Sequence, residues 1–99
     1  MDLPPYRDSM AVIFRRAHNA FRTHWKMHDN KAPLKLVLTP SQADDLHDCQ
    51  VLGQVAFPGV EPPRRDEFNG RPVVITESTV GEIVAHDGTV TPLSDYDSI

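Results

Sequence analysis

The amino-acid sequence predicts a single α+β domain, and three features support this prediction. A long helical pattern comes first, a short strand pattern that leads into a helix start comes next, and further strand patterns around a tight turn close the chain. The length of 99 residues is enough to bury one modest core. We therefore expect one domain over residues 1–99, with frayed tails at residues 1–7 and 94–99.

Residues 8–29 show the clearest pattern, because their apolar residues recur at the spacing of one α-helix face. Prolines at positions 4, 5 and 33 bracket the segment, as expected for helix boundaries. The apolar stripe consists of Met10, Ile13, Phe14, Ala17, Phe21 and Trp25. We expect it to face the core, with Phe21 and Trp25 as its main buried side chains.

A strand and a second helix are predicted after this segment. Residues 34–38 form a short apolar run, and Thr39-Pro40-Ser41-Gln42 matches the capping-box pattern with proline at the first helical position. Acidic residues at positions 44, 45 and 48 suit the positive end of the helix dipole. Gly53 is the expected C-terminal cap of this helix.

The remaining residues predict a long loop followed by a small, mainly antiparallel sheet. Residues 54–71 lack a clear period and contain several prolines and glycines, which is typical of a loop. Residues 73–76 predict a strand. Two further strands, at 82–86 and 89–91, flank Asp87-Gly88, and this dipeptide predicts a tight hairpin turn with positive φ at both positions.

Composition places the protein among ordinary globular proteins, with 39% hydrophobic and 24% charged residues. No apolar run approaches the roughly 18 residues of a membrane span, and residues 1–8 do not resemble a signal peptide. The single cysteine, Cys49, suits a reducing compartment. We therefore expect a cytoplasmic protein with no membrane partner.

Charge is distributed unevenly along the chain. Residues 1–36 contain seven Lys or Arg and three acidic residues, whereas the rest contains three Lys or Arg and eleven acidic residues. This asymmetry indicates either an electrostatic partner for one end or self-pairing, and homo-oligomerisation stays open.

Three groups of residues were considered for catalysis. Cys49 and His47 lie two apart on a predicted helix and point away from each other, so a nucleophile–base pair is not favoured. Glu77 with Glu82, and the three aspartates of the second helix, have no apolar pocket that the sequence can show. The nucleotide-binding and hydrolase motifs are missing from the sequence. We expect no enzymatic activity, no catalytic residue and no cofactor.

A metal site was considered at His24 and His28, which lie four residues apart on the first helix. This spacing lets two imidazoles reach one ion, but such a site needs at least a third protein ligand. Because the sequence shows no further ligand pair, we expect histidines at the edge of the core and no metal site.

Basic residues lie on the opposite face of the first helix. Arg15, Asn19, Arg22 and Lys26 recur at helical spacing, and no acidic residue at that spacing neutralises them. In the predicted loop, Arg64 and Arg65 offer a second basic contact point. We expect these six residues to belong to a surface that binds an acidic partner. An acidic chain favours a protein partner over nucleic acid.

Two segments, "LKLVLTPSQADDL" and "FNGRPVVITES", resemble small proteins encoded by tailed bacteriophages and prophages. Their order is also similar to the axial domain of phage major capsid proteins, in which a strand and helix precede a "G-x-P-V" strand. The resemblance rests on Leu36, Leu38, Pro40, Leu46, Phe68, Gly70, Pro72 and Val73. The chain is too short for a capsid subunit.

This resemblance implies a non-enzymatic phage or prophage accessory protein in the cytoplasm of a bacterial host. Such a protein would bind a host protein stoichiometrically, as an inhibitor or modulator of that protein or of a defence system. The alternatives are a structural or assembly subunit of the virion and a nucleic-acid-binding regulator.

Overall fold

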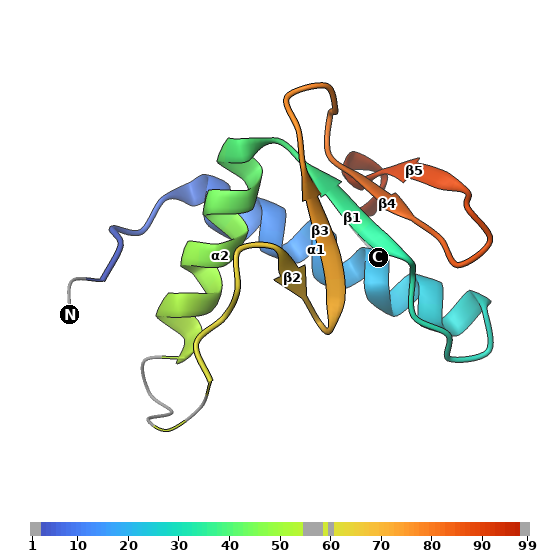
Figure 1. The fold of residues 1–99 in the computed structure, drawn as a ribbon, viewed down its shortest axis with the longest axis horizontal. Helices are drawn as coiled ribbons and strands as arrows, with labels where there is room; N and C mark the ends of the chain where they lie inside the picture. Colours follow the sequence, from blue (N-terminus) through green and yellow to red (C-terminus); the bar gives the residue numbers. More distant parts are fainter. Residues whose placement is uncertain (1–2, 55–58, 60, 98–99) are drawn as a thin grey trace.

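The computed structural model describes residues 3–54, 59 and 61–97 and confirms the α+β class (Figure 1). Two α-helices accompany a five-stranded sheet, and a short 3-10 helix follows the last strand. In chain order the elements are α1 (Asp8–Met27), β1 (Lys35–Leu38), α2 (Pro40–Gln54), β2 (Glu67–Phe68), β3 (Arg71–Ile75), β4 (Glu82–Val84), β5 (Val90–Pro92) and η1 (Leu93–Tyr96).

The strands lie in the order β2-β3-β1-β4-β5. Only β1 and β3 run parallel, with Leu36 opposite Val73, and the other three pairs are antiparallel. The parallel pair follows from the connection, because the chain passes through α2 before it returns as β3. The expectation of a mainly antiparallel sheet is therefore confirmed.

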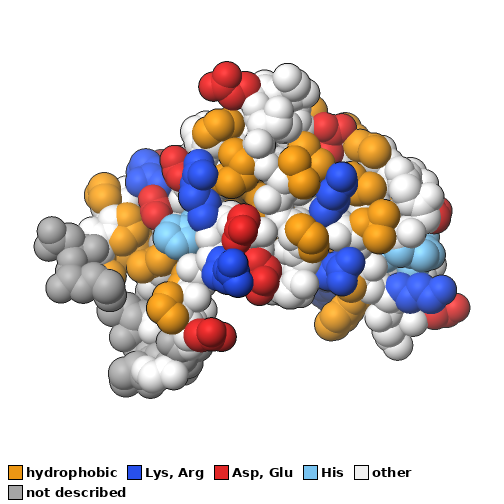
Figure 2. Space-filling model, viewed as in Figure 1, with side chains coloured by type: hydrophobic (Ala, Val, Ile, Leu, Met, Phe, Trp, Pro, Cys, Tyr) orange, Lys and Arg blue, Asp and Glu red, His pale blue; other side chains and the backbone are white. Residues whose placement is uncertain are grey.

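One face of the sheet packs against both helices, and α1 passes behind β1 and β3 in Figure 1. Alternate residues of the strands point to this face, among them Leu36, Leu38 and Ile83, which are at most 3% exposed. Figure 2 looks onto the other face, where hydrophobic side chains lie between Lys and Arg side chains. Val74 is 41% exposed there.

The core confirms one of the two expected aromatic residues of α1 and contradicts the other. Phe21 is 6% exposed and meets Phe68 of β2 edge to face, with ring centroids 5.2 Å apart. Trp25 is 54% exposed, and Phe14 is 37% exposed. The expectation of a buried Trp25 is wrong, because Trp25 lines an open groove with Ala32 and Asn69, whereas Phe21 packs on Phe68.

The start of α2 agrees with the sequence. The Gln42 N–H donates to Thr39 Oγ1 over 3.1 Å, and the Thr39 N–H donates to Gln42 Oε1 over 3.0 Å, which is the predicted capping box. Gly53, expected as the C-terminal cap, instead lies inside the helix. Residues 55–58 and 60 of the predicted loop lie outside the described residues.

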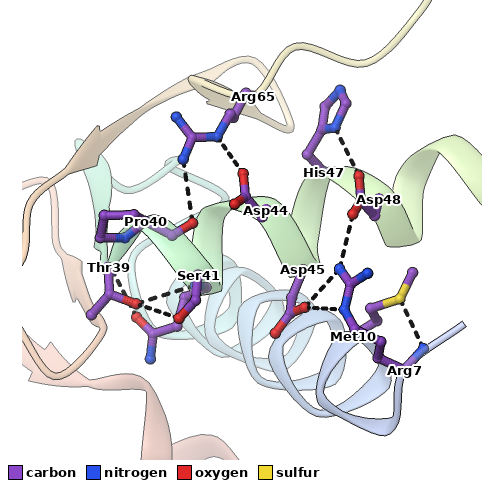
Figure 3. Close-up of polar contacts among 11 residues, drawn as sticks. Arg7, Met10, Thr39, Pro40, Ser41, Asp44, Asp45, His47, Asp48 and Arg65 are labelled. Atoms are coloured by element: carbon purple, nitrogen blue, oxygen red, sulfur yellow. Dashed lines mark hydrogen bonds and ion pairs between the residues drawn. The ribbon is translucent and has the colours of Figure 1, made fainter. Parts of the chain in front are cut away.

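The aspartates of α2 lie beyond its first turn, contrary to the expectation that they suit the helix dipole, and they form ion pairs instead (Figure 3). The Arg7 guanidinium, just before α1, contacts Asp45 over 2.9 Å and Asp48 over 2.8 Å. These contacts join the start of α1 to α2. The pKa of Asp48 is lowered, mainly by its hydrogen bond from Arg7.

The two hairpin turns differ from expectation. Asn69 and Gly70, predicted as part of a loop, form the two-residue turn between β2 and β3, with φ of 50° and 79°. At the β4–β5 turn only Gly88 has positive φ, at 91°, whereas positive φ was expected for Asp87 as well. The Gly88 N–H donates to the Ala85 carbonyl, which makes a three-residue loop that ends in a left-handed glycine.

After β5 the chain continues as η1 (Leu93–Tyr96), which reaches into the segment where a frayed tail was expected. Leu93 is 1% exposed and belongs to the core. The η1 helix packs against α1. Within the described residues, no helix is long and apolar enough to cross a membrane.

Candidate functional site

The C-terminal half of α1 is bordered by two groups of side chains. On one flank, α1 and the β2–β3 turn form an open groove. On the other flank, α1 and the β4–β5 turn bring three histidines together. Because β2 and β5 are the two edge strands, the two turns belong to opposite edges of the sheet.

The groove has a volume of about 480 Å³ and a largely apolar lining. Its α1 wall contains exposed Trp25, Arg22 and His18 above buried Phe21. Ala32, from the segment after α1, and Asn69, from the β2–β3 turn, complete the lining. A flat aromatic ring and a guanidinium thus lie side by side on a surface that solvent can reach.

The basic stripe expected on α1 is divided in two by the C-terminal segment. Arg15 lies 3.6 Å from the Asp97 carboxylate, and the Asn19 amide donates to the Tyr96 carbonyl over 3.0 Å. No acidic residue at helical spacing was expected to neutralise the stripe, and the acid that contacts Arg15 is instead Asp97, from the far end of the chain. Arg22 and Lys26 have no ion pair among the residues that the structure describes.

The two loop arginines are not part of the groove lining, and each contacts an acidic residue. Arg65 contacts the Asp44 carboxylate over 2.6 Å and also donates to the Pro40 carbonyl (Figure 3). Arg64 lies 3.6 Å from Asp66, and both side chains are well exposed. Of the six residues predicted to bind a partner, Arg22 alone lines the groove.

The second group consists of His24, His28 and His86. One ring nitrogen of each lies within 4.8 Å of the others. His24 is 6% exposed, and its Nδ1 is 2.7 Å from the Lys31 carbonyl oxygen. Its Nε2 faces His86, at 3.2 Å from the backbone nitrogen and 3.3 Å from Nδ1 of that residue.

Two groups at this cluster, His24 and Asp87, have lowered pKa values. Burial lowers the pKa of His24, and the hydrogen bond to the Lys31 carbonyl opposes this effect. Asp87, next to His86 in the turn, has its pKa lowered mainly by the hydrogen bond that its carboxylate accepts from the Thr89 N–H. The Asp87 carboxylate thus lies at the same cavity as His24 and His28 and next to His86 in the chain.

Sequence reasoning missed the third histidine. His24 and His28 were recognised by their helical spacing, but His86 lies far along the chain in a separate hairpin. The expectation that no third imidazole approaches the pair is wrong. A histidine within the turn beside Asp87-Gly88 was visible in the sequence, but the sequence does not show where the turn lies in the fold.

The residues considered for catalysis remain apart or engaged in local contacts. Burial raises the pKa of the half-buried Cys49 thiol, which disfavours the reactive thiolate. His47 faces the Asp48 carboxylate at 3.4 Å. Glu82 accepts a hydrogen bond from the Thr79 hydroxyl. His47 and Glu82 are therefore engaged by neighbours in the chain.

Comparison with known proteins leaves function to be inferred from these two groups of residues. No family model matches the chain, and neither a curated protein nor a solved structure matches it.

Proposed function

We propose that this protein acts without catalysis, by binding another protein stoichiometrically through the groove on α1. The observation that supports the proposal is the exposure of Trp25 beside Arg22, which has no ion pair among the described residues. Tryptophan and arginine are the residue types that most often dominate the binding energy of protein interfaces. A tryptophan left 54% exposed is available for such a contact.

The lining of the groove indicates the chemistry of the partner. Phe21, Ala32 and the Trp25 ring offer an apolar wall that an aliphatic or aromatic side chain can cover. Arg22 and nearby Lys26 would receive a carboxylate at the rim. We therefore expect a partner segment that presents an apolar anchor next to an acidic residue, and we expect the charges to act mainly on the association rate.

The resemblance in sequence extends this proposal to the biological role. The partner would be a protein of a bacterial host, and the chain a phage or prophage accessory protein that inhibits or modulates it. A nucleic-acid partner is less favoured, because Arg15 already contacts Asp97 and Arg65 already contacts Asp44.

A virion or assembly subunit is the alternative, and the uncovered face of the sheet favours it. Val74, on the interior strand β3, is 41% exposed on that face, and Val90, on the edge strand β5, is 52% exposed. A subunit of this kind would cover that face with another copy. Size-exclusion chromatography with light scattering distinguishes the two roles, because a ring or larger oligomer supports the virion role and a monomer or dimer supports the groove.

The groove is tested with the single tryptophan as its own reporter. Proteins retained from a host lysate by the wild-type chain are first identified, and their affinity for each purified variant is then measured by isothermal titration calorimetry. Trp25 fluorescence is recorded in parallel for the variants that keep the tryptophan. Arg22→Glu and Trp25→Ala are compared with Lys35→Glu, a matched charge reversal on β1 and outside the groove. Far-UV circular dichroism checks that each variant is folded.

A partner that shifts Trp25 emission, and that loses affinity at least about tenfold with Arg22→Glu but not with Lys35→Glu, supports the proposal. Equal binding by folded Arg22→Glu, Trp25→Ala and wild type would exclude the groove. Loss of binding only with Lys35→Glu would place the partner-binding surface on the sheet instead of the groove.

A further inference from the structure

We propose that His24, His28 and His86 form a binding site for one divalent transition-metal ion of the zinc class. The site lies between the C-terminal end of α1 and the β4–β5 turn, and it is separate from the groove. Three imidazoles converge there from two elements, although the chain contains only five histidines. Imidazole is a ligand that Zn²⁺, Cu²⁺ and Ni²⁺ all accept.

The positions of the three side chains follow from the fold. His24 and His28 are one turn apart on α1, so both imidazoles project from the same flank, with ring centroids 4.3 Å apart. The β4–β5 turn places His86 against both rings, at centroid distances of 5.3 Å and 4.5 Å. The three side chains therefore surround one point from two independent directions.

The distances between ring nitrogens suit a tetrahedral ion. At Zn–N bond lengths of about 2.0–2.1 Å, two ligand nitrogens of a tetrahedral site lie about 3.3 Å apart. His24 Nε2 and His86 Nδ1 are 3.3 Å apart. The largest separation among the three ligand atoms is within 4.8 Å, so a rotation of the less buried His28 side chain would complete the set.

His24 is oriented as metal-binding histidines usually are. Its Nδ1–H donates to the Lys31 carbonyl, which leaves the Nε2 lone pair directed at His86. A ligating histidine commonly donates its other ring N–H to a backbone carbonyl or carboxylate in this way. The turn after α1 holds the carbonyl in place, because Asp29 and Asn30 adopt left-handed φ values of 52° and 63° and the Lys31 N–H donates to the His28 carbonyl.

Metal binding would change one contact of the structure. The backbone N–H of His86 now donates to His24 Nε2 over 3.2 Å, and that lone pair cannot serve the amide and an ion together. The ion would take the lone pair, and the His86 N–H would lose its present acceptor. This exchange supplies a readout at one backbone amide.

The surroundings of the cluster favour a cation and leave it accessible. The Asp87 carboxylate lies near the imidazoles and offsets part of the charge of the ion. A cavity of about 210 Å³ borders His24, His28 and Asp87. Three protein ligands and an open position for water is the arrangement expected of an accessible zinc site. Bound metal would also tie the β4–β5 hairpin to α1.

The test uses full-length protein without an affinity tag, stripped of metal with a chelator. Zn²⁺ is titrated in competition with a chromophoric chelator, and Co²⁺ serves as a spectroscopic probe of tetrahedral geometry. His28→Ala and His86→Ala are compared with His47→Ala, which also leaves four histidines but lies on α2. Buried His24 is left unchanged because its removal endangers the fold.

We expect wild type and His47→Ala to bind one Zn²⁺ with equal affinity, to show the visible bands of tetrahedral Co²⁺ and to gain thermal stability with the metal. Each of the other two variants should lose more than about 100-fold in affinity, since even the loss of an outer hydrogen bond to a ligand costs 10–100-fold. In the NMR spectrum of the wild type, the His86 amide should shift on addition of Zn²⁺.

Two results would overturn the proposal. The first is the absence of saturable binding to the wild type at micromolar Zn²⁺. The second is a Zn²⁺ affinity of folded His86→Ala equal to that of His47→Ala, which would reduce the three histidines to hydrogen-bonded side chains at the edge of the core. Neither result bears on the groove, because its test requires no metal.

Discussion

The groove and the histidine cluster are built in the same way on opposite flanks of α1, yet their side chains have different surroundings. Each combines one flank of the helix with one hairpin turn, Asn69 from the β2–β3 turn and His86 from the β4–β5 turn. In the groove, Trp25 and Arg22 face solvent. In the cluster, His24 is buried and its two ring nitrogens both face polar groups.

This difference shows how the partner class follows from local packing. The exposed Trp25 ring lies beside Arg22, which has no ion pair within the described part of the chain, and this combination suits a protein partner. Imidazoles held by a backbone carbonyl and a neighbouring turn offer fixed donor atoms around a point, which suits an ion. Residues only one helical turn apart therefore contribute to different chemistry.

The largest effect is expected at Phe21, which lies beneath the groove and supports its floor. Phe21→Ala should lower the free energy of unfolding by about 3–5 kcal/mol, because it removes a buried ring that packs against Phe68. Urea denaturation followed by circular dichroism measures this change. A loss below about 1 kcal/mol would mean that the groove floor is not part of the core.

The two turns should respond alike to a bulky residue at their left-handed glycines. Gly70→Val and Gly88→Val should each destabilise the protein by about 1–2 kcal/mol, although a Cβ would meet no atom within 4 Å at either position. The destabilisation comes from the positive φ of these two positions, which a side chain with a Cβ rarely adopts. Gly53 lies inside α2 without positive φ, so Gly53→Ala should instead stabilise the protein by about 0.5–1 kcal/mol. Urea midpoints test all three. Destabilisation by Gly53→Ala, or none by the valines, would contradict this account.

A smaller effect on stability is expected at Asp48 of α2, which belongs to neither the groove nor the histidine cluster. Asp48→Asn should lower stability at pH 7 by about 0.5–1 kcal/mol through loss of the Arg7 contact. Because Arg7 lowers the pKa of Asp48, the wild-type advantage is present above the ordinary carboxyl pKa of about 3.9. It should disappear as pH falls through the lower folded-state pKa.

Denaturation at pH 7 and at progressively lower pH measures this dependence. Asp66→Asn is the control, since Asp66 and Arg64 are 3.6 Å apart and both side chains are mostly exposed. An equal loss in the two variants at pH 7 would show that the Arg7 contact adds nothing beyond an ordinary surface charge.

The smallest effect on stability is expected at Trp25. Trp25→Ala should change the free energy of unfolding by no more than about 0.5 kcal/mol, the usual range for surface substitutions. Partner binding should nevertheless weaken strongly, so the contrast with Phe21 separates the floor of the groove from its open wall. A destabilisation comparable to that of Phe21→Ala would indicate that Trp25 is buried in solution.

Features set by neighbouring residues were predictable from the sequence. The period of the apolar residues located α1, and Thr39 with Gln42 located the start of α2, because a capping box needs only residues three apart. The Asp87-Gly88 turn was also located, although its φ values differed. At Asn69-Gly70 an equally local signal was present and was read as part of a loop.

Features set by distant residues could be decided only by the tertiary structure. The helical period places Phe21 and Trp25 on one stripe, but Phe68 of β2 covers only Phe21, while Trp25 lines an open groove. Asp97 and Arg15 meet because η1 packs against α1. His86 joins His24 and His28 because strand pairing brings the β4–β5 turn to the end of the helix. The sequence by itself determined the two helices and the strands β1, β3, β4 and β5, since these depend on local spacing, but it did not show β2 or η1. The two candidate sites depend on which segments far apart in the chain come into contact.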